Sequence, residues 1–142
     1  MVADKNNVTR NFIQSLPYVK AMQMALTKIA PGEAEMAMPY DSQFVGDPMT
    51  GVIHGGAMSA LIDTCCGAAV ISHPACPAGT ATIDLRIDYM RPATPGEALS
   101  TRAVCYHVTQ SVAFVRATAY DEDKSSPVAN AAGAFTMLGR VK

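Results

Sequence analysis

The 142-residue sequence contains no tryptophan and few charged residues, and its charges of opposite sign nearly cancel. The 11 lysines and arginines are matched by 12 aspartates and glutamates, which gives a formal net charge of −1. A nucleic-acid surface requires clustered Lys and Arg, and no such cluster is present. No apolar run approaches the roughly 20 residues of a membrane helix, and the first ten residues lack the apolar core of a signal peptide. We therefore expect neither nucleic acid nor a membrane as a partner.

Cysteine is present, but not in a pattern typical of a metal site or a disulfide framework. No C-x-x-C motif occurs, and two of the four cysteines are adjacent. The four are Cys65, Cys66, Cys76 and Cys105. This pattern predicts reduced thiols, and hence a cytoplasmic protein without a bound metal.

The length suits one domain, which we place at residues 1–142. A chain of this size buries roughly two thirds of its unfolded surface on folding. Since 49% of the residues are apolar, the composition favours a well-packed core or a subunit interface.

A long apolar segment predicts one central helix. Between Gly55 and Ser72 the polar side chains are few: Ser59, Asp63, Thr64 and Ser72 itself. A helix that is apolar almost all round is buried on most sides. Upstream, we expect a short helix over residues 8–23, interrupted near Pro17, because proline disrupts a helix interior.

Strand patterns dominate the rest of the chain. Residues 80–90 alternate with a period of two, which predicts a strand with one apolar face. That face comprises Ala81, Ile83, Leu85, Ile87 and Tyr89. Further strands are expected at 98–108, 111–120 and 127–138, and short links between them predict an antiparallel sheet. Residues 24–38 predict a strand or a bent strand pair, and residues 40–53 predict a loop.

The combination of these motifs resembles the hotdog-fold thioesterases, specifically the PaaI-like acyl-CoA thioesterases. The resemblance rests on His54-Gly55-Gly56, on Asp63 nine residues after that histidine, and on the strand TIDLRIDYMRP at 82–92. It covers residues 12–138. It implies an α+β hotdog fold, with an antiparallel sheet of about five strands wrapped around one long central helix (β-α-β4) and a short N-terminal helix.

The resemblance also implies an activity. Members of this family hydrolyse an acyl-CoA to the free acid and CoA without a metal or other cofactor. The expected substrate is an aryl- or short- to medium-chain acyl-CoA. The expected assembly is a homodimer or homotetramer with the active site at the subunit interface.

Site residues follow from the same resemblance. Asp63 corresponds to the catalytic acid, acting as base or nucleophile, and the Gly55 backbone N–H to the donor that polarises the thioester carbonyl. His54 lies beside that donor, and Thr82 corresponds to the residue that helps to place the attacking water. Contacts with the substrate are expected from Gly56, Ser59, Ile83 and Arg91.

Spacing gives an independent reason for a shared site. Gly55 and Asp63 are eight residues apart, which is roughly 12 Å along a helix at about 1.5 Å per residue. A reacting carbon should lie about 3 Å from both groups. One helix cannot meet that condition, so the site must combine Gly55 of one subunit with Asp63 of another.

One position departs from the family pattern. Many relatives carry an asparagine six residues before the motif histidine, where this sequence has Pro48. Asp47 or Gln43 could replace the missing side chain. The departure also keeps open a second function, a non-catalytic acyl-CoA-binding protein on the same fold.

Structural explanations exist for most of these residues. Asp63 could bond only to Ser59 or to the backbone, His54 could cap the helix, and Thr82 could be an ordinary strand residue. Arg91, at a strand end, could grip a CoA phosphate or simply face solvent.

A third function would use Cys65 or Cys66 as a nucleophile with His54. It is disfavoured because burial in an apolar helix raises the pKa of a thiol unless a cation is near.

Overall fold

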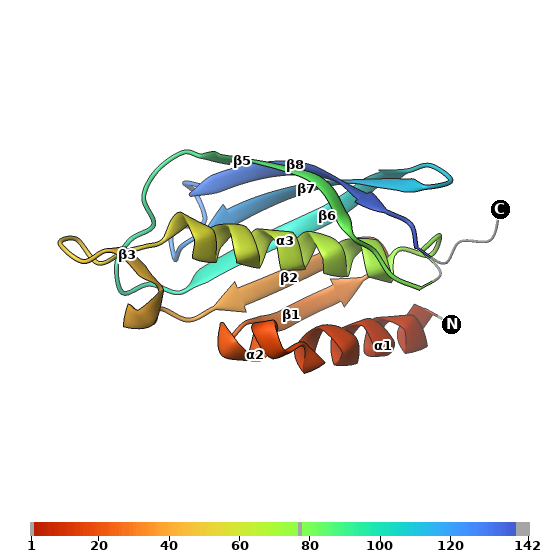
Figure 1. Cartoon of the computed structure of the whole chain (residues 1–142), viewed down its shortest axis with the longest axis horizontal. Helices are drawn as coiled ribbons and strands as arrows, with labels where there is room; N and C mark the ends of the chain where they lie inside the picture. Colours follow the sequence, from red (N-terminus) through yellow and green to blue (C-terminus); the bar gives the residue numbers. More distant parts are fainter. Residues whose placement is uncertain (1, 77, 139–142) are drawn as a thin grey trace.

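A six-stranded antiparallel sheet curves around one long helix in the computed structural model, which describes residues 2–76 and 78–138 (Figure 1). The strands lie in the order β1-β2-β6-β7-β8-β5. Their bounds are β1 (Ala25–Ala30), β2 (Glu33–Met38), β5 (Thr82–Tyr89), β6 (Leu99–Val108), β7 (Val112–Tyr120) and β8 (Ala129–Thr136). The predicted fold class is confirmed. The sheet has one strand more than the expected five because residues 24–38 form two strands.

Helix α3 (Gly55–Ser72) begins and ends where the sequence predicts. Its buried side chains pack against β6, β2 and β7, the middle of the sheet (Figure 1). By length and composition alone α3 could cross a membrane, so the expectation that no segment approaches that length is too strong. The core helix of a globular protein has the same composition, and the packing against the sheet accounts for the apolar character here.

The end of α3 is held to the sheet by its last polar side chain. The buried Ser72 hydroxyl accepts a hydrogen bond from the Gly32 N–H at 3.2 Å and lies 2.9 Å from the Ala30 carbonyl oxygen, to which it can donate. Gly32 has a φ of +74° in the β1–β2 turn, a conformation that favours glycine. This contact fixes the axial position of α3 relative to the sheet.

Two short helices precede the sheet, α1 (Val2–Ser15) and α2 (Pro17–Ala21). The interruption near Pro17 is confirmed, and the proline occupies the first turn of α2, where its missing N–H leaves no bond unmade. The start at residue 8 was wrong, because α1 begins at Val2. Helix α1 packs beside α3 and β1 (Figure 1).

Residues 40–53 are more regular than the loop that the sequence predicts. They form a 3-10 helix, η1 (Ser42–Phe44), and a two-stranded ribbon of β3 (Val45–Asp47) and β4 (Val52–Ile53). Polar side chains that read as loop residues stabilise these turns: Asp41 accepts from the Gln43 N–H, and Asp47 accepts from the Met49 N–H. The ribbon leads directly into α3.

Strand β5 lies at the edge of the sheet and leaves part of its apolar face uncovered. The period-two pattern correctly predicts a strand, but Ile83 is 56% exposed and Tyr89 is 51% exposed. Leu85 and Ile87 are half-buried. An edge strand with exposed apolar side chains is a surface suited to pairing with another chain.

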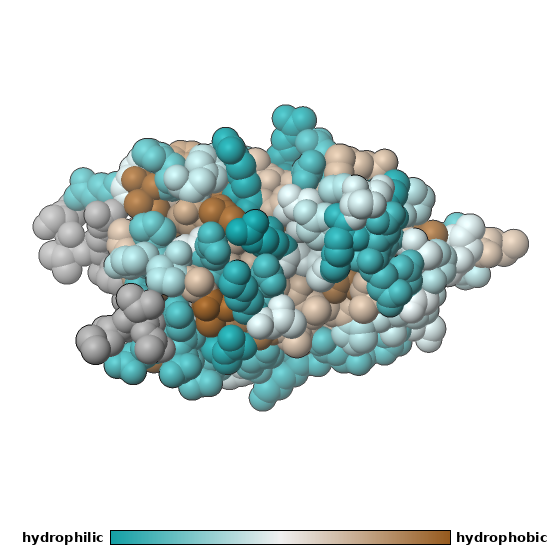
Figure 2. Space-filling model, turned by 180° about the vertical axis from the view of Figure 1, so that it is seen from behind, coloured by the Kyte–Doolittle hydropathy of each residue, from teal (hydrophilic) through white to brown (hydrophobic). Residues whose placement is uncertain are grey.

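The opposite face of the molecule, seen from behind in Figure 2, is mostly hydrophilic with scattered apolar atoms. On β7, the exposed Arg116 places its guanidinium carbon 4.1 Å from the centre of the Tyr106 ring. The apolar core therefore lies between the concave face of the sheet and α3.

Candidate active site

The N-terminus of α3 carries an unpaired backbone donor. The His54 Nδ1 atom accepts a hydrogen bond from the Gly56 N–H at 2.7 Å, so His54 caps the helix. Among the described residues, the Gly55 N–H has no hydrogen-bond partner. Free N–H groups at a helix N-terminus, together with the helix dipole, favour an anion at this point.

The structural reason for glycine differs between positions 55 and 56. A Cβ on Gly56 would lie 2.8 Å from His54 Nδ1, so a larger residue would displace the cap. A Cβ on Gly55 would lie 3.7 Å from the Tyr89 ring, an ordinary contact distance. The His54 cap therefore requires glycine at position 56, whereas at position 55 the neighbouring atoms leave room for a Cβ.

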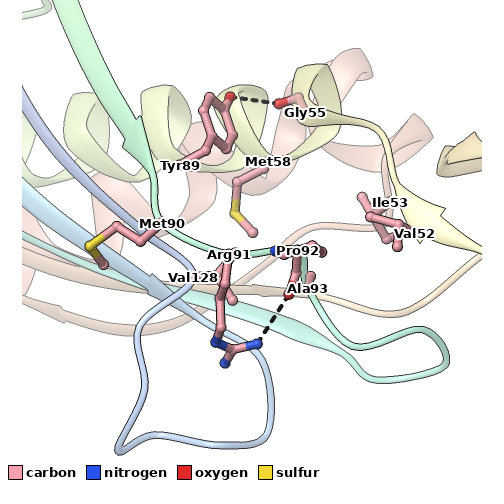
Figure 3. A pocket seen from close by; sticks show the side chains of 10 residues that line it. All are labelled: Val52, Ile53, Gly55, Met58, Tyr89, Met90, Arg91, Pro92, Ala93 and Val128. Carbon is pink, nitrogen blue, oxygen red and sulfur yellow. Dashed lines mark hydrogen bonds between the residues drawn. The ribbon is translucent and has the colours of Figure 1, made fainter.

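An apolar cavity opens beside Gly55 (Figure 3). Its volume is about 460 Å³, and its wall is formed by α3, β4, the end of β5, the loop after β5 and the loop before β8. The lining residues are Val52, Ile53, Gly55, Met58, Tyr89, Met90, Arg91, Pro92, Ala93 and Val128. A cavity of this size and character can hold an apolar group of a small ligand next to the free Gly55 N–H.

Asp63 lies elsewhere on α3 and is bonded to the other end of β5. Its Oδ1 accepts a hydrogen bond from the Thr82 hydroxyl at 2.7 Å, and the carboxylate is half-buried. The structure therefore pairs Asp63 with Thr82 rather than with Ser59, which donates to the Gly56 carbonyl. A carboxylate held by a hydroxyl is suited to orienting a water molecule or to attacking a carbonyl carbon.

Gly55 and Asp63 do not meet within one chain. Both lie on the uninterrupted helix α3, so about 12 Å along its axis separates them. Asp63 is not among the residues that line the cavity. The structure thus brings together Asp63 with Thr82, and Gly55 with His54, as two half-sites at different positions on one helix.

The predicted substrate contacts are dispersed. Ser59 bonds within the first turns of α3, and Ile83 is exposed on the edge strand. Gly56 is exposed beside the cavity, with its N–H committed to His54. Of the eight predicted site residues, Gly55 and Arg91 line the cavity.

Arg91 has a structural partner that the sequence did not reveal. Its guanidinium makes two bonds to the fully buried Asp121, at 2.6 Å and 2.8 Å, and further bonds to the Ser126 and Pro92 carbonyls. Figure 3 shows the guanidinium pointing away from Gly55 and Tyr89. These bonds commit the guanidinium donors within the chain, which disfavours Arg91 as a phosphate ligand.

Asp121 holds together the two loops that border the cavity. Besides Arg91, it accepts hydrogen bonds from the Thr94 N–H and hydroxyl and from the Asp123 N–H. The Arg91 guanidinium holds the pKa of Asp121 well below its usual value, and the other three bonds lower it further. The ionised form is therefore stabilised in the folded state.

Replacing this carboxylate is expected to destabilise the fold. Asp121→Asn leaves Arg91 without its counter-ion, so we expect Tm at pH 7 to fall by roughly 5 °C or more. The depressed pKa adds a pH signature. The stability it provides is present above the unfolded-state pKa of about 3.9 and is lost as the pH falls toward the folded-state value. Calorimetry should therefore show a steeper decline in Tm below about pH 4 for the wild type than for Asp121→Asn. Parallel curves would contradict this interpretation.

The two candidates for replacing the missing asparagine are both engaged locally. The Asp47 carboxylate accepts from the Met49 N–H and the Thr50 hydroxyl, and Gln43 donates to Asp41. Neither side chain lines the cavity. The Pro48 side chain has no group that can form a hydrogen bond, so it cannot position a reactant as the family asparagine would.

The cysteines lie in the core rather than at a reactive site. All four are buried and unpaired. Burial raises the pKa of Cys66 to about 12 and raises that of Cys65 well above its usual value. A thiol with so high a pKa is almost entirely protonated at neutral pH and is a poor nucleophile.

The cysteines are accordingly expected to be dispensable for turnover. Cys66→Ala and Cys65→Ala should keep kcat within about twofold of wild type, since neither thiolate is populated. Both should lose some stability because they leave small cavities in the core. Steady-state kinetics per folded protein checks this, and loss of turnover in a folded double variant would restore the cysteine hypothesis.

No group of three His, Cys, Asp or Glu side chains is placed to hold a metal ion within residues 2–76 and 78–138.

The family model of the thioesterase superfamily matches residues 50–128, which include both half-sites. The chain belongs to the thioesterase superfamily, and its architecture is the hotdog fold. Its sequence is similar to the medium/long-chain acyl-CoA thioesterase YigI of Escherichia coli, at 25% identity over 126 residues that cover 80% of this chain and 81% of that protein.

Solved structures agree with this assignment. A crystal structure of a Pseudomonas aeruginosa protein is 35% identical, with a TM-score of 0.82, covering 94% of this chain and 99% of that chain. PaaI of E. coli, from the phenylacetic acid degradation operon, has a TM-score of 0.87 and covers 99% of each chain. At 19% identity, the PaaI match speaks for the fold alone.

Proposed function

We propose that this protein hydrolyses the thioester bond of an acyl-CoA. The observation that carries the proposal is that Gly55, whose backbone N–H is unpaired, lies in the wall of an apolar cavity of about 460 Å³. This arrangement can bind an acyl chain and hold its carbonyl oxygen against a helix N-terminus. Negative charge that develops on that oxygen is stabilised by the N–H and the helix dipole.

In the proposed mechanism, Asp63 acts on the other side of the carbonyl. Water attacks the carbonyl carbon while Asp63 accepts the water proton, and the Thr82 hydroxyl holds the carboxylate in place. The tetrahedral intermediate then breaks its C–S bond, and the CoA sulfur leaves and takes up a proton. If Asp63 instead attacks directly, an acyl-aspartyl anhydride forms and water cleaves it, with the same products.

The proposal requires at least two subunits. Gly55 and Asp63 of one chain are about 12 Å apart along α3, which is too far for a single carbonyl group to contact both. The exposed apolar residues of edge strand β5 provide a surface that a second subunit could cover, next to Thr82. We therefore propose a homodimer or homotetramer in which each site takes Gly55 from one subunit and Asp63 from its partner.

The cavity wall favours an uncharged acyl group. Nine of its ten lining residues have apolar or aromatic side chains or none, and the one cation, Arg91, is paired with Asp121. A charged acyl group would lose its hydration there without a partner. Aryl and short- to medium-chain acyl groups satisfy this condition, and the name of the YigI relative points to medium or long chains.

A panel of acyl-CoAs with thiol detection tests the proposal. We expect release of one thiol per thioester cleaved, with aryl or unbranched acyl groups preferred over dicarboxylic ones. The alternative, a non-catalytic acyl-CoA-binding protein, is suggested by Pro48 at the position of the family asparagine. Single-turnover measurements with protein in excess separate the two, because a binding protein would retain the acyl-CoA intact.

A further inference from the structure

We propose that Tyr89 is a positioning residue that acts together with His54 to clamp the Gly55–Gly56 peptide group. The inference rests on the proposed function, because the clamp matters to catalysis only if the Gly55 N–H serves as the donor to the thioester oxygen. In the sequence, Tyr89 stands within the strand motif TIDLRIDYMRP and on the apolar face of that strand, but neither pattern assigns it a role at the site.

The clamp consists of two hydrogen bonds to opposite ends of one peptide group. The Tyr89 hydroxyl donates to the Gly55 carbonyl at 2.8 Å (Figure 3). The N–H of the same peptide, which belongs to Gly56, donates to His54 Nδ1 at 2.7 Å. A peptide group is planar, so fixing its oxygen and its nitrogen fixes the orientation of the whole unit.

The local sequence gives this peptide group little conformational restraint of its own. It joins two adjacent glycines, which restrict the backbone less than any other residue. It also lies in the first turn of α3, where N–H groups lack intrahelical partners and helices fray. The unpaired Gly55 N–H belongs to the preceding peptide, so its direction depends on how firmly the Gly55–Gly56 unit is held.

The position of Tyr89 indicates that it does more than line the cavity wall. The residue is 51% exposed, and its hydroxyl donates a hydrogen bond to a main-chain carbonyl. Thr82, at the other end of the same strand, bonds to Asp63. Strand β5 therefore supports both half-sites, and one hydroxyl at each end sets the geometry of one of them.

The rate should be sensitive to this geometry. An oxyanion donor is effective only when it points at the place where charge develops, and small misplacements lower the rate substantially. The clamp acts on the transition state more than on acyl binding, which depends on the apolar wall. Loss of the hydroxyl should therefore lower kcat and leave KM nearly unchanged.

The variant Tyr89→Phe removes the hydroxyl and keeps the ring. We expect kcat to fall about tenfold, KM to change by less than about twofold, and Tm to remain close to wild type. The matched control is Tyr106→Phe, since Tyr106 is a similarly exposed tyrosine outside both half-sites. Its kcat should equal that of wild type.

A second readout does not depend on activity. Amide hydrogen exchange of Gly56, followed by NMR in the intact protein, should be faster in Tyr89→Phe and unchanged in Tyr106→Phe. An unchanged kcat in Tyr89→Phe, or a rise in KM with kcat preserved, would overturn the positioning role. A wild-type protein without turnover would instead refute the proposed function. In that case the amide exchange of Gly56 still tests the clamp. Equal exchange rates in Tyr89→Phe and wild type would contradict it.

Discussion

Asp63→Asn is expected to lower the rate of thioester hydrolysis by about 10²–10⁴-fold, the range typical of a lost acid–base residue. The amide oxygen can still accept the hydrogen bond from Thr82, so the local packing should persist. An amide cannot take a proton from water or form an anhydride, so the chemistry should stop. Because Asp63 does not line the cavity, acyl-CoA binding should remain.

The measurement is a single-turnover rate together with acyl-CoA affinity by calorimetry. Asp84→Asn is a matched control, since Asp84 is an exposed carboxylate on β5, two residues after Thr82. It should react at the wild-type rate. If Asp63 were only structural, Asp63→Asn would lose stability or nothing, and its rate per folded protein would stay near wild type.

Gly55→Pro is expected to cost about 10²–10³-fold in kcat, the effect of removing one oxyanion donor. Proline removes the Gly55 N–H without breaking the helix, because the first helical position tolerates proline. The chain ahead of it is already suitable: His54 has φ −58° and ψ 136°, the conformation that a residue before proline prefers.

Gly55→Ala provides the matched control. It keeps the N–H, and its Cβ would lie 3.7 Å from the Tyr89 ring. We expect it to retain far more activity than Gly55→Pro, with Tm values of the two variants close together. Equal loss in both would mean that space at Gly55, and not its N–H, is what the reaction needs.

The sequence predicted the helix that carries the site better than it predicted the residues that line the cavity. The bounds of α3 follow from an apolar run that starts at Gly55 and ends at Ser72, and the single carboxylate within it marks Asp63. The sequence did not predict the Asp63–Thr82 bond. The family resemblance named both residues for the site, but nothing in the spacing of a helix and a strand specifies which side chains meet. The structure shows that the Thr82 hydroxyl donates a hydrogen bond to the Asp63 carboxylate.

Other features depend on contacts between distant segments. The cavity is formed by residues of three separate stretches, 52–58, 89–93 and 128, and its methionines and valines have the same pattern as core residues. The partner of Arg91 is Asp121, thirty positions away, in a loop whose charges look solvated in the sequence. For His54, the sequence allowed both a capping and a chemical role. The contact with Gly56 shows the cap, and a role in catalysis stays a prediction.

The central claim is that each active site draws Gly55 from one subunit and Asp63 from another. Co-expression of Gly55→Pro with Asp63→Asn, each nearly inactive alone, tests it most directly. With random pairing, a site has a one-half chance of an intact Gly55 and an independent one-half chance of an intact Asp63, so one quarter of sites are complete. The account predicts recovery to about a quarter of wild-type activity in the randomly paired mixture, and to about half in isolated hybrid dimers, given the separation along α3. Hybrids verified by mass spectrometry that stay as inactive as the parent variants would contradict the account, because both groups would then come from one chain.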